Sequence, residues 1–247
     1  MGVTFLGGLA RLVEHRGGSI IFNWQSLQKR ISVNLAQNGF LQAFGCAQVS
    51  WDGNSIPYRS DLEYHAESIG DYLHTKWLGK GWVNISPELQ DLISGKVAEI
   101  YLNAFDHSQS PIGIFSCGQH YPRLGWLHLT AVDFGMGIPQ SVRSLPANKD
   151  LSSTDALEWA LRSGTSTKPK DIGSGLGLNL LQSFVIANGG SLKIFSNDSC
   201  LIIDDNGVKY KNVTTNFTGT LIDIAFRCDE SYYCLEAEAS SPDEPWF

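Results

Sequence analysis

The chain lacks any hydrophobic run of the length that a membrane crossing requires. Its 247 residues are 43% hydrophobic, but no apolar stretch approaches the roughly 20 residues that span a bilayer. The first twelve residues also lack the basic start, apolar centre and small-residue cleavage site of a secretory signal peptide. These absences predict a protein that acts in the cytoplasm and not at a membrane.

Cysteine is scarce, and its spacing is unlike that of a metal site or a disulfide framework. The five cysteines are odd in number and form no CxxC pair. This pattern argues against structural zinc and against disulfide bonds, and it fits a reducing compartment.

Positive charge is missing from the end of the chain. Residues 228–247 hold six acidic residues and no Lys or Arg, within a net charge of −7. The rest of the chain is therefore close to neutral. A neutral body with an acidic tail has no electrostatic footprint for nucleic acid, and we interpret the tail as a solvated or partly ordered end.

The two commonest nucleotide-binding signatures are also missing. No GxxxxGK[ST] loop is present, and the GxGxxG-like stretch at 173–178 follows a polar loop, whereas a dinucleotide-binding fingerprint follows a strand. There is no internal repeat. What the chain does contain is a series of three short motifs: EIYLNAFDH at 99–107, DFGMG at 133–137 and GSGLGL at 173–178.

In this order the three motifs resemble the N, G1 and G2 boxes of the GHKL superfamily, the ATP-binding domain of DNA gyrase B, heat-shock chaperones, histidine kinases and mismatch-repair ATPases. The resemblance covers about residues 86–227. It implies ATP and Mg²⁺ as ligands. It also implies an α/β fold: a two-layer sandwich with helices on one face of a mixed, mostly antiparallel sheet.

The first motif lies on a helix expected over residues 86–107, with Ser86 as its N-cap. Glu99, Asn103 and His107 are spaced i, i+4, i+8 and so share one face. The resemblance makes Asn103 a magnesium ligand, Glu99 the general base and His107 a neighbour of the phosphates. An amphipathic helix with a solvated polar face is the alternative. The expected core stripe is Leu92, Ile93, Val97, Ile100 and Ala104.

The second motif follows an apolar strand expected over residues 127–132. An ionised Asp133 has only acceptors, so it can take a hydrogen bond from the adenine amine, and the resemblance gives it this role. Gly135 and Gly137 would let the backbone approach the base and sugar. A strand that ends in an ordinary Asp- and Gly-rich turn is the alternative.

The third motif opens a helix expected to run to about residue 188. Its backbone N–H groups would hold phosphate oxygens. The polar loop before it resembles an ATP lid, and a strand over residues 219–226 matches the last strand of the family, with Thr220 on the adenine side. The cofactor-binding residues expected in this part of the chain are Ser166, Thr167, Lys168, Gly173, Gly175, Leu176, Gly177, Leu178 and Thr220.

The start of the chain resembles the second half of a STAS domain, through a helix expected at 7–14, a strand at 19–23 and a helix at 26–38. The phosphorylatable Ser or Thr of STAS regulators is replaced by Leu6 and Gly7, and the first strands of the module are missing. We expect a loop at 51–57 and a helix at 61–78. The predicted units are therefore 1–80 (partial STAS-like segment and linker helix), 81–227 (ATP-binding domain) and 228–247 (acidic tail).

Three functional classes remain open. The protein could be an ATPase switch that uses Glu99, a kinase that acts on a separate protein, or a module that senses ATP without turning it over. His65 lacks the sequence context of a histidine-kinase acceptor. The STAS-like start favours a regulatory protein that switches between protein partners, and a homodimer is an open alternative.

Overall fold

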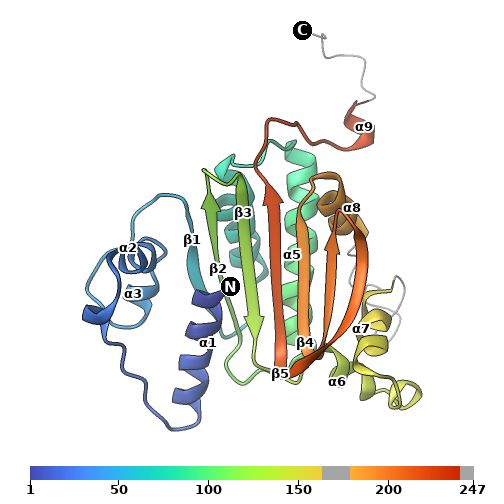
Figure 1. Cartoon of the computed structure of the whole chain (residues 1–247), viewed down its shortest axis with the longest axis horizontal. Coiled ribbons are helices and arrows are strands. Elements are labelled where there is room, and N and C mark those ends of the chain that lie inside the picture. Colours follow the sequence, from blue (N-terminus) through green and yellow to red (C-terminus); the bar gives the residue numbers. More distant parts are fainter. Residues whose placement is uncertain (163–178, 240–247) are drawn as a thin grey trace.

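One five-stranded sheet organises the residues that the computed structural model describes, which are 1–162 and 179–239 (Figure 1). Every pair of neighbouring strands in it is antiparallel, so the sheet is more regular than the mixed one that we expected. The α/β class is confirmed. In spatial order the strands are β1 (Ser55–Asp61), β2 (Ile114–Tyr121), β3 (Trp126–Asp133), β5 (Gly207–Arg227) and β4 (Ser191–Asp204).

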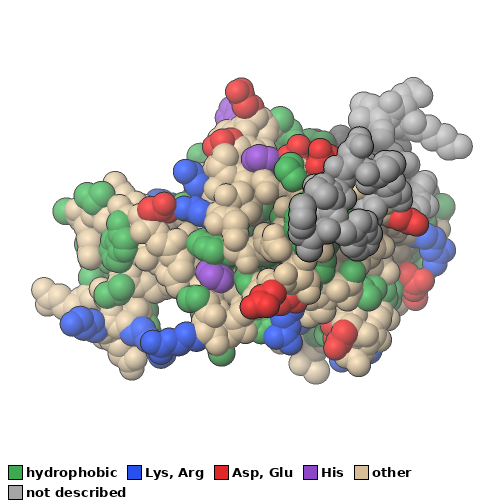
Figure 2. All heavy atoms as spheres, turned by 90° about the horizontal axis from the view of Figure 1, so that it is seen from above, with side chains coloured by type: hydrophobic (Ala, Val, Ile, Leu, Met, Phe, Trp, Pro, Cys, Tyr) green, Lys and Arg blue, Asp and Glu red, His purple; other side chains and the backbone are tan. Residues whose placement is uncertain are grey.

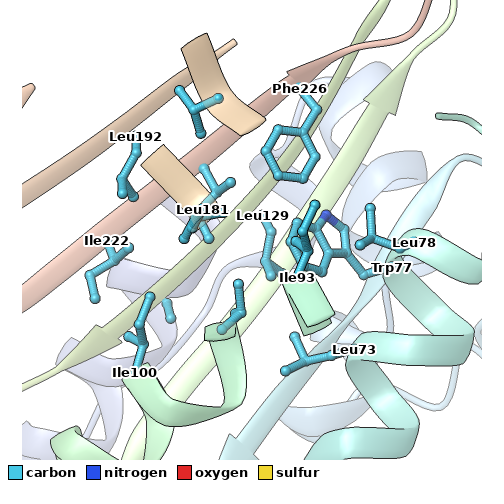
Figure 3. Close-up of a cluster of buried hydrophobic side chains, with 14 of the residues drawn as sticks. Leu73, Trp77, Leu78, Ile93, Ile100, Leu129, Leu181, Leu192, Ile222 and Phe226 are labelled. Atoms are coloured by element: carbon cyan, nitrogen blue, oxygen red, sulfur yellow. The ribbon is translucent and has the colours of Figure 1, made fainter. Parts of the chain in front are cut away.

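A helical layer covers one face of this sheet. It contains α5 (Pro87–His107), α8 (Asn179–Ala187) and the run of α4 (Ala66–Asp71), a π-helical turn (Tyr72–Trp77) and a 3₁₀ turn (Leu78–Lys80). Figure 3 shows their apolar side chains meeting those of the strands in the main core, which includes Leu73, Trp77, Ile93, Ile100, Leu129, Leu181, Ile222 and Phe226. Near the end of β3, α6 (Ile138–Arg143), a 3₁₀ turn (Pro146–Asn148) and α7 (Ser153–Leu161) follow one another.

The opposite face of the sheet carries α1 (Gly2–His15), which belongs to the N-terminal segment that we expected to form a separate unit. Phe5 and Leu12 of α1 pack on a second cluster that contains Phe115, Val132 and Phe134. Successive residues of β2 and β3 point into different cores, because strand side chains alternate. The approach is close enough that a Cβ added to Gly8 would lie 2.2 Å from a Phe134 ring carbon.

The rest of the N-terminal part comprises a 3₁₀ turn (Trp24–Ser26), α2 (Lys29–Gln37) and α3 (Phe40–Ala43). The strand expected at 19–23 is wrong, since these residues belong to no helix or strand. The loop expected at 51–57 is wrong in its second half, where β1 begins. Pro57, which has no N–H, sits at a register shift between Ile56 and Arg59, and so β1 tolerates it.

Strand β1 precedes the boundary that we expected near residue 80, yet it pairs with β2, which follows that boundary. At the other end of the chain, residues of the expected acidic tail pack beside the start of α5. Ser86 N–H donates to the Tyr233 carbonyl at 2.8 Å, and Ser86 Oγ donates to Glu238 Oε2 at 2.7 Å. Helix α9 (Glu236–Ala239) carries this Glu238.

Candidate functional site

Helix α5 carries the first group of expected site residues, and the sequence determines where it begins. Ser86 Oγ accepts a hydrogen bond from Leu89 N–H at 3.2 Å, with Pro87 in the first turn, as an N-cap does. Ile93, Val97 and Ile100 of the expected stripe are buried, but Leu92 is 44% exposed, and Tyr101 is buried instead. The stripe is therefore rotated slightly from the one that we predicted.

Glu99, Asn103 and His107 are all half-buried along the edge of this stripe. Asn103 Nδ2 donates to the Glu99 carbonyl at 2.8 Å. This hydrogen bond uses the amide nitrogen of Asn103, which is a donor. The side-chain oxygen is the acceptor of the amide, and it is the atom that can bind a hard cation. The face that we expected therefore exists, at the boundary between core and solvent.

The Glu99 carboxylate has a cationic partner on the same helix. Lys96 Nζ lies 2.7 Å from Glu99 Oε1, and the Glu99 side chain is 43% exposed. An ammonium group at this distance competes with any water or hydroxyl for the carboxylate oxygens. To act as a base from this position, Glu99 must bind the water or hydroxyl either in place of Lys96 or with its second carboxylate oxygen while Lys96 stays bound.

Asp133 is more deeply buried than Thr220, Glu99, Asn103 and His107. It ends β3 and is 2% exposed. Its Oδ1 accepts from Gly135 N–H at 2.9 Å, and the Thr220 and Ser108 side chains also donate to it. Burial nevertheless raises the pKa of Asp133 to about 7, because desolvation outweighs these hydrogen bonds.

Thr220 lies directly opposite Asp133 in the β3–β5 register. The structure therefore brings together two expected residues that are far apart in the sequence. Thr220 Oγ1 is also 3.2 Å from Ser196 Oγ on β4, and Ser196 Oγ accepts from Ile138 N–H at 2.8 Å. A short row of hydroxyls thus connects Asp133 with the start of α6.

The two glycines of the second motif fit closely against the protein itself. A Cβ on Gly135 would lie 2.0 Å from the Ser108 carbonyl oxygen, and one on Gly137 would lie 2.7 Å from Asn197 Oδ1. Gly137 also has φ of +83°, which disfavours other residues. The close approaches that we expected are present, and in the described residues they are made by the chain's own backbone and side chains.

The sequence motifs do not include three residues that contact Asp133, Thr220 or the loop after Asp133, which are Ser108, Ser196 and Asn197. Ser108 follows α5 directly and its carbonyl accepts from Met136 N–H at 2.6 Å; Asn197 Nδ2 donates to the Met136 carbonyl at 3.1 Å. Both residues fix the loop after Asp133. A serine just past the first motif was a usable signal, but Ser196 and Asn197 sit inside a long strand with nothing in the pattern to mark them.

A small hollow adjoins Asp133 at the end of α5. It is lined by Ala104, Phe105, Ser108, Gln109, Ser110, Gly113 and Ile114. Ser108 donates to Asp133, and Ile114 pairs with Asp133 across β2 and β3. Two of the residues that line the hollow are therefore also neighbours of Asp133.

The remaining expected site residues lie outside the described residues. They are Ser166, Thr167, Lys168, Gly173, Gly175, Leu176, Gly177 and Leu178, between α7 and α8. In the described parts of the chain there is no group of three or more His, Cys, Asp or Glu side chains that could hold a metal ion. No helix among these residues is long and apolar enough to cross a membrane.

No protein-family model matches this chain, and a search of curated proteins finds no match either.

Proposed function

We propose that this protein binds ATP with Mg²⁺ at a site formed by Asp133 and by the face of α5 that carries Glu99, Asn103 and His107. We also propose that the chain is a member of the GHKL superfamily and has the fold of its ATP-binding domain. The observation that carries the proposal is the position of Asp133. A carboxyl that is 2% exposed and bonded to Thr220 and Ser108 is costly to bury, and such groups concentrate at functional sites. Its acceptor oxygens suit the exocyclic amine of adenine.

The order of the elements supports the same proposal. Helix α5 carries Glu99, Asn103 and His107, the next two strands end at Asp133, and the strand beside β3 carries Thr220. Asn103 would supply one oxygen ligand to Mg²⁺ while phosphates and water fill the other positions. His107 would lie near the phosphates, and the glycine-rich motif at 173–178 would supply N–H donors to them.

Nucleotide titration of a substituted protein tests the position of the base. Asp133→Asn should weaken ATP binding and reduce the preference for ATP over GTP, because the amide presents a donor where adenine also presents one. Asp223→Asn is the matched control, since Asp223 is also buried on the sheet and bonded to a threonine, Thr130, at 2.7 Å. If Asp133→Asn bound ATP as tightly as the parent, the proposed site would be wrong.

The proposed chemistry is ATP hydrolysis, or transfer of phosphate to a separate protein, with Glu99 as the general base. The 2.7 Å contact between Lys96 and Glu99 favours a second candidate, an ATP-sensing module without turnover. ATP labelled at the γ-phosphate separates these functions. Released phosphate indicates an ATPase, labelled protein indicates a kinase, and label that stays on ATP indicates a sensor. Activity that persists in Glu99→Ala would remove Glu99 from the catalytic role.

A further inference from the structure

Residues 19–24 have the side-chain pattern of a β-strand, although they belong to no sheet. Ile20, Phe22 and Trp24 are half-buried, while the residues between them are exposed, and Ile21 is 92% exposed. Alternation with a period of two is what an extended segment with one buried face produces. The segment is therefore held in a strand-like arrangement by one of its faces.

Aromatic contacts hold that face in place. The rings of Phe22 and Trp24 stack with centroids 4.7 Å apart, and Phe22 also contacts Phe40 at 5.8 Å and Phe44 at 5.1 Å. These rings belong to a small apolar cluster that includes Leu35 of α2. The side chains cannot turn over without leaving that cluster.

The backbone of the same segment is unpaired. Within the part of the chain that the structure describes, the N–H and C=O groups of residues 19–22 make no backbone hydrogen bond. A segment with alternating burial, unpaired backbone groups and an exposed isoleucine has the features of a template for another strand.

We propose that residues 19–24 are a docking edge to which a partner protein adds a β-strand flanked by acidic residues. Main-chain hydrogen bonds would provide affinity, and Ile21 would contact alternate apolar side chains of the added strand. The acidic flanks follow from charge: residues 1–50 hold four cations and one acid, in a chain of net charge −7. The exposed cations nearest to residues 19–24 in the sequence are Arg16, Lys29 and Arg30.

Hydrophobic side chains and Lys and Arg side chains gather on the side of the molecule that carries α1, α2 and α3 (Figure 2). Among residues 1–60 the most exposed large hydrophobic residues are Ile21, Val49, Met1 and Val33.

Two other occupants fit the edge less well. A second copy paired antiparallel through Ile21 would bring the cations on both sides of the edge towards those of its twin, and like charges repel. A membrane surface would attract the cations and the apolar side chains, but it would leave the backbone of residues 19–22 without partners in an apolar medium. A strand flanked by acidic residues would pair with the cations and would also form hydrogen bonds with the backbone N–H and C=O groups of residues 19–22.

A labelled peptide of alternating threonine and valine, with two glutamates at each end, is the probe. Binding to the full chain is measured by fluorescence anisotropy, and amide hydrogen exchange shows which residues are protected. We expect protection at 19–24 and affinity at least about tenfold higher than for the same peptide with lysine in place of glutamate. A proline at the centre of the peptide should abolish binding.

Proline substitutions in the protein identify the edge. Consecutive N–H groups of a strand point to its two opposite edges. Because proline has no N–H, Ile21→Pro removes a donor from one edge of the segment and Ile20→Pro removes a donor from the other. One of them should weaken peptide binding about tenfold and the other should not. Leu62→Pro is the control, because Leu62 is 71% exposed and precedes α4. Urea unfolding confirms that each variant is folded, and Ile21→Asp is a second test that leaves the backbone intact.

Four outcomes would overturn the proposal. The first is that the glutamate peptide does not protect residues 19–24. The second is that the lysine peptide binds as tightly as the glutamate peptide. The third is that neither proline variant nor Ile21→Asp changes peptide binding. The fourth is protection of 19–24 by a second copy at raised protein concentration, or by anionic phosphatidylglycerol vesicles, in place of the peptide. None of these measurements involves ATP, so a failure here is separate from a failure of the proposed nucleotide site.

Discussion

The free energy of burying Asp133 should make the stability of the protein depend on pH. The pKa of its carboxyl is raised from 3.8 to about 7 in the folded chain, so between these values the folded state holds a proton that the unfolded state has lost. Stability then falls as pH rises from about 4 to about 7 and is constant above that. The difference corresponds to about 4 kcal/mol.

Urea unfolding at several pH values measures this effect. Asp133→Asn has nearly the same volume and cannot titrate, so the parent should lose stability relative to the variant between pH 4 and 7. Parallel pH profiles for the two proteins would mean that the pKa of the Asp133 carboxyl is the same in the folded and unfolded states.

The same carboxyl should make ATP affinity depend on pH. Adenine needs an acceptor, and below pH 7 the carboxyl in the free protein carries a proton that binding must displace. Affinity should therefore rise with pH, by up to about tenfold per pH unit below 7, and level off above. Calorimetry in buffers of different ionisation enthalpy detects the released proton. Asp133→Asn serves as the reference, because its affinity reports the titration of the nucleotide and of the other groups around it, without that of the Asp133 carboxyl.

At the scale of elements, the start of α5 depends on one serine. Ser86 Oγ accepts from Leu89 N–H and donates to Glu238. Ser86→Ala should lower the free energy of unfolding by about 1 kcal/mol, the usual value of an N-cap, and should speed amide exchange at the Tyr233 end of the chain. Ser144→Ala, which removes an exposed hydroxyl after α6, should change neither. Equal effects of the two substitutions would contradict this.

Some of these elements could be predicted from the sequence and others could not. Helix α5 and strand β3 carry their own signals, a Ser-Pro start and an apolar run that ends in Asp-Phe-Gly. Strand β1 carries a misleading one, because Pro57 reads as a loop until the register shift beside it is known. Residues 19–23 have the composition of a strand, but a strand also needs a neighbour, and nothing within a segment specifies whether one is present.

The candidate site shows the same division. The spacing of Glu99 and Asn103 predicts a shared helix face, and that face exists. The pairing of Asp133 with Thr220 could be expected only by resemblance, because it depends on which strand lies next to β3. The ion pair of Glu99 with Lys96 was not anticipated, although the i, i+3 spacing was visible.

At the scale of the whole molecule, α1 and the proposed nucleotide site lie on opposite faces of the sheet, but Phe134 connects them. Phe134 follows Asp133 and packs on α1, where a Cβ on Gly8 would lie 2.2 Å from its ring. Gly8→Ala should therefore displace Phe134 and weaken ATP binding severalfold. Gly2→Ala, on the same helix with nothing near its Cβ, should leave the affinity unchanged. If both variants bound ATP like the parent, the contact would be purely structural.

The arrangement of the strands also has a consequence for synthesis. At the centre of the sheet β3 pairs with β5, and the Thr130–Asp223 bond joins residues 93 positions apart. Contacts of such long range make folding slow, because a large loop must close before they form. During synthesis β1, β2 and β3 leave the ribosome before β5 does. Until β5 pairs with it, β3 is an unpaired edge strand. At roughly 5–20 residues per second this wait lasts seconds, and in that interval the unpaired edge of β3 exposes the nascent chain to aggregation.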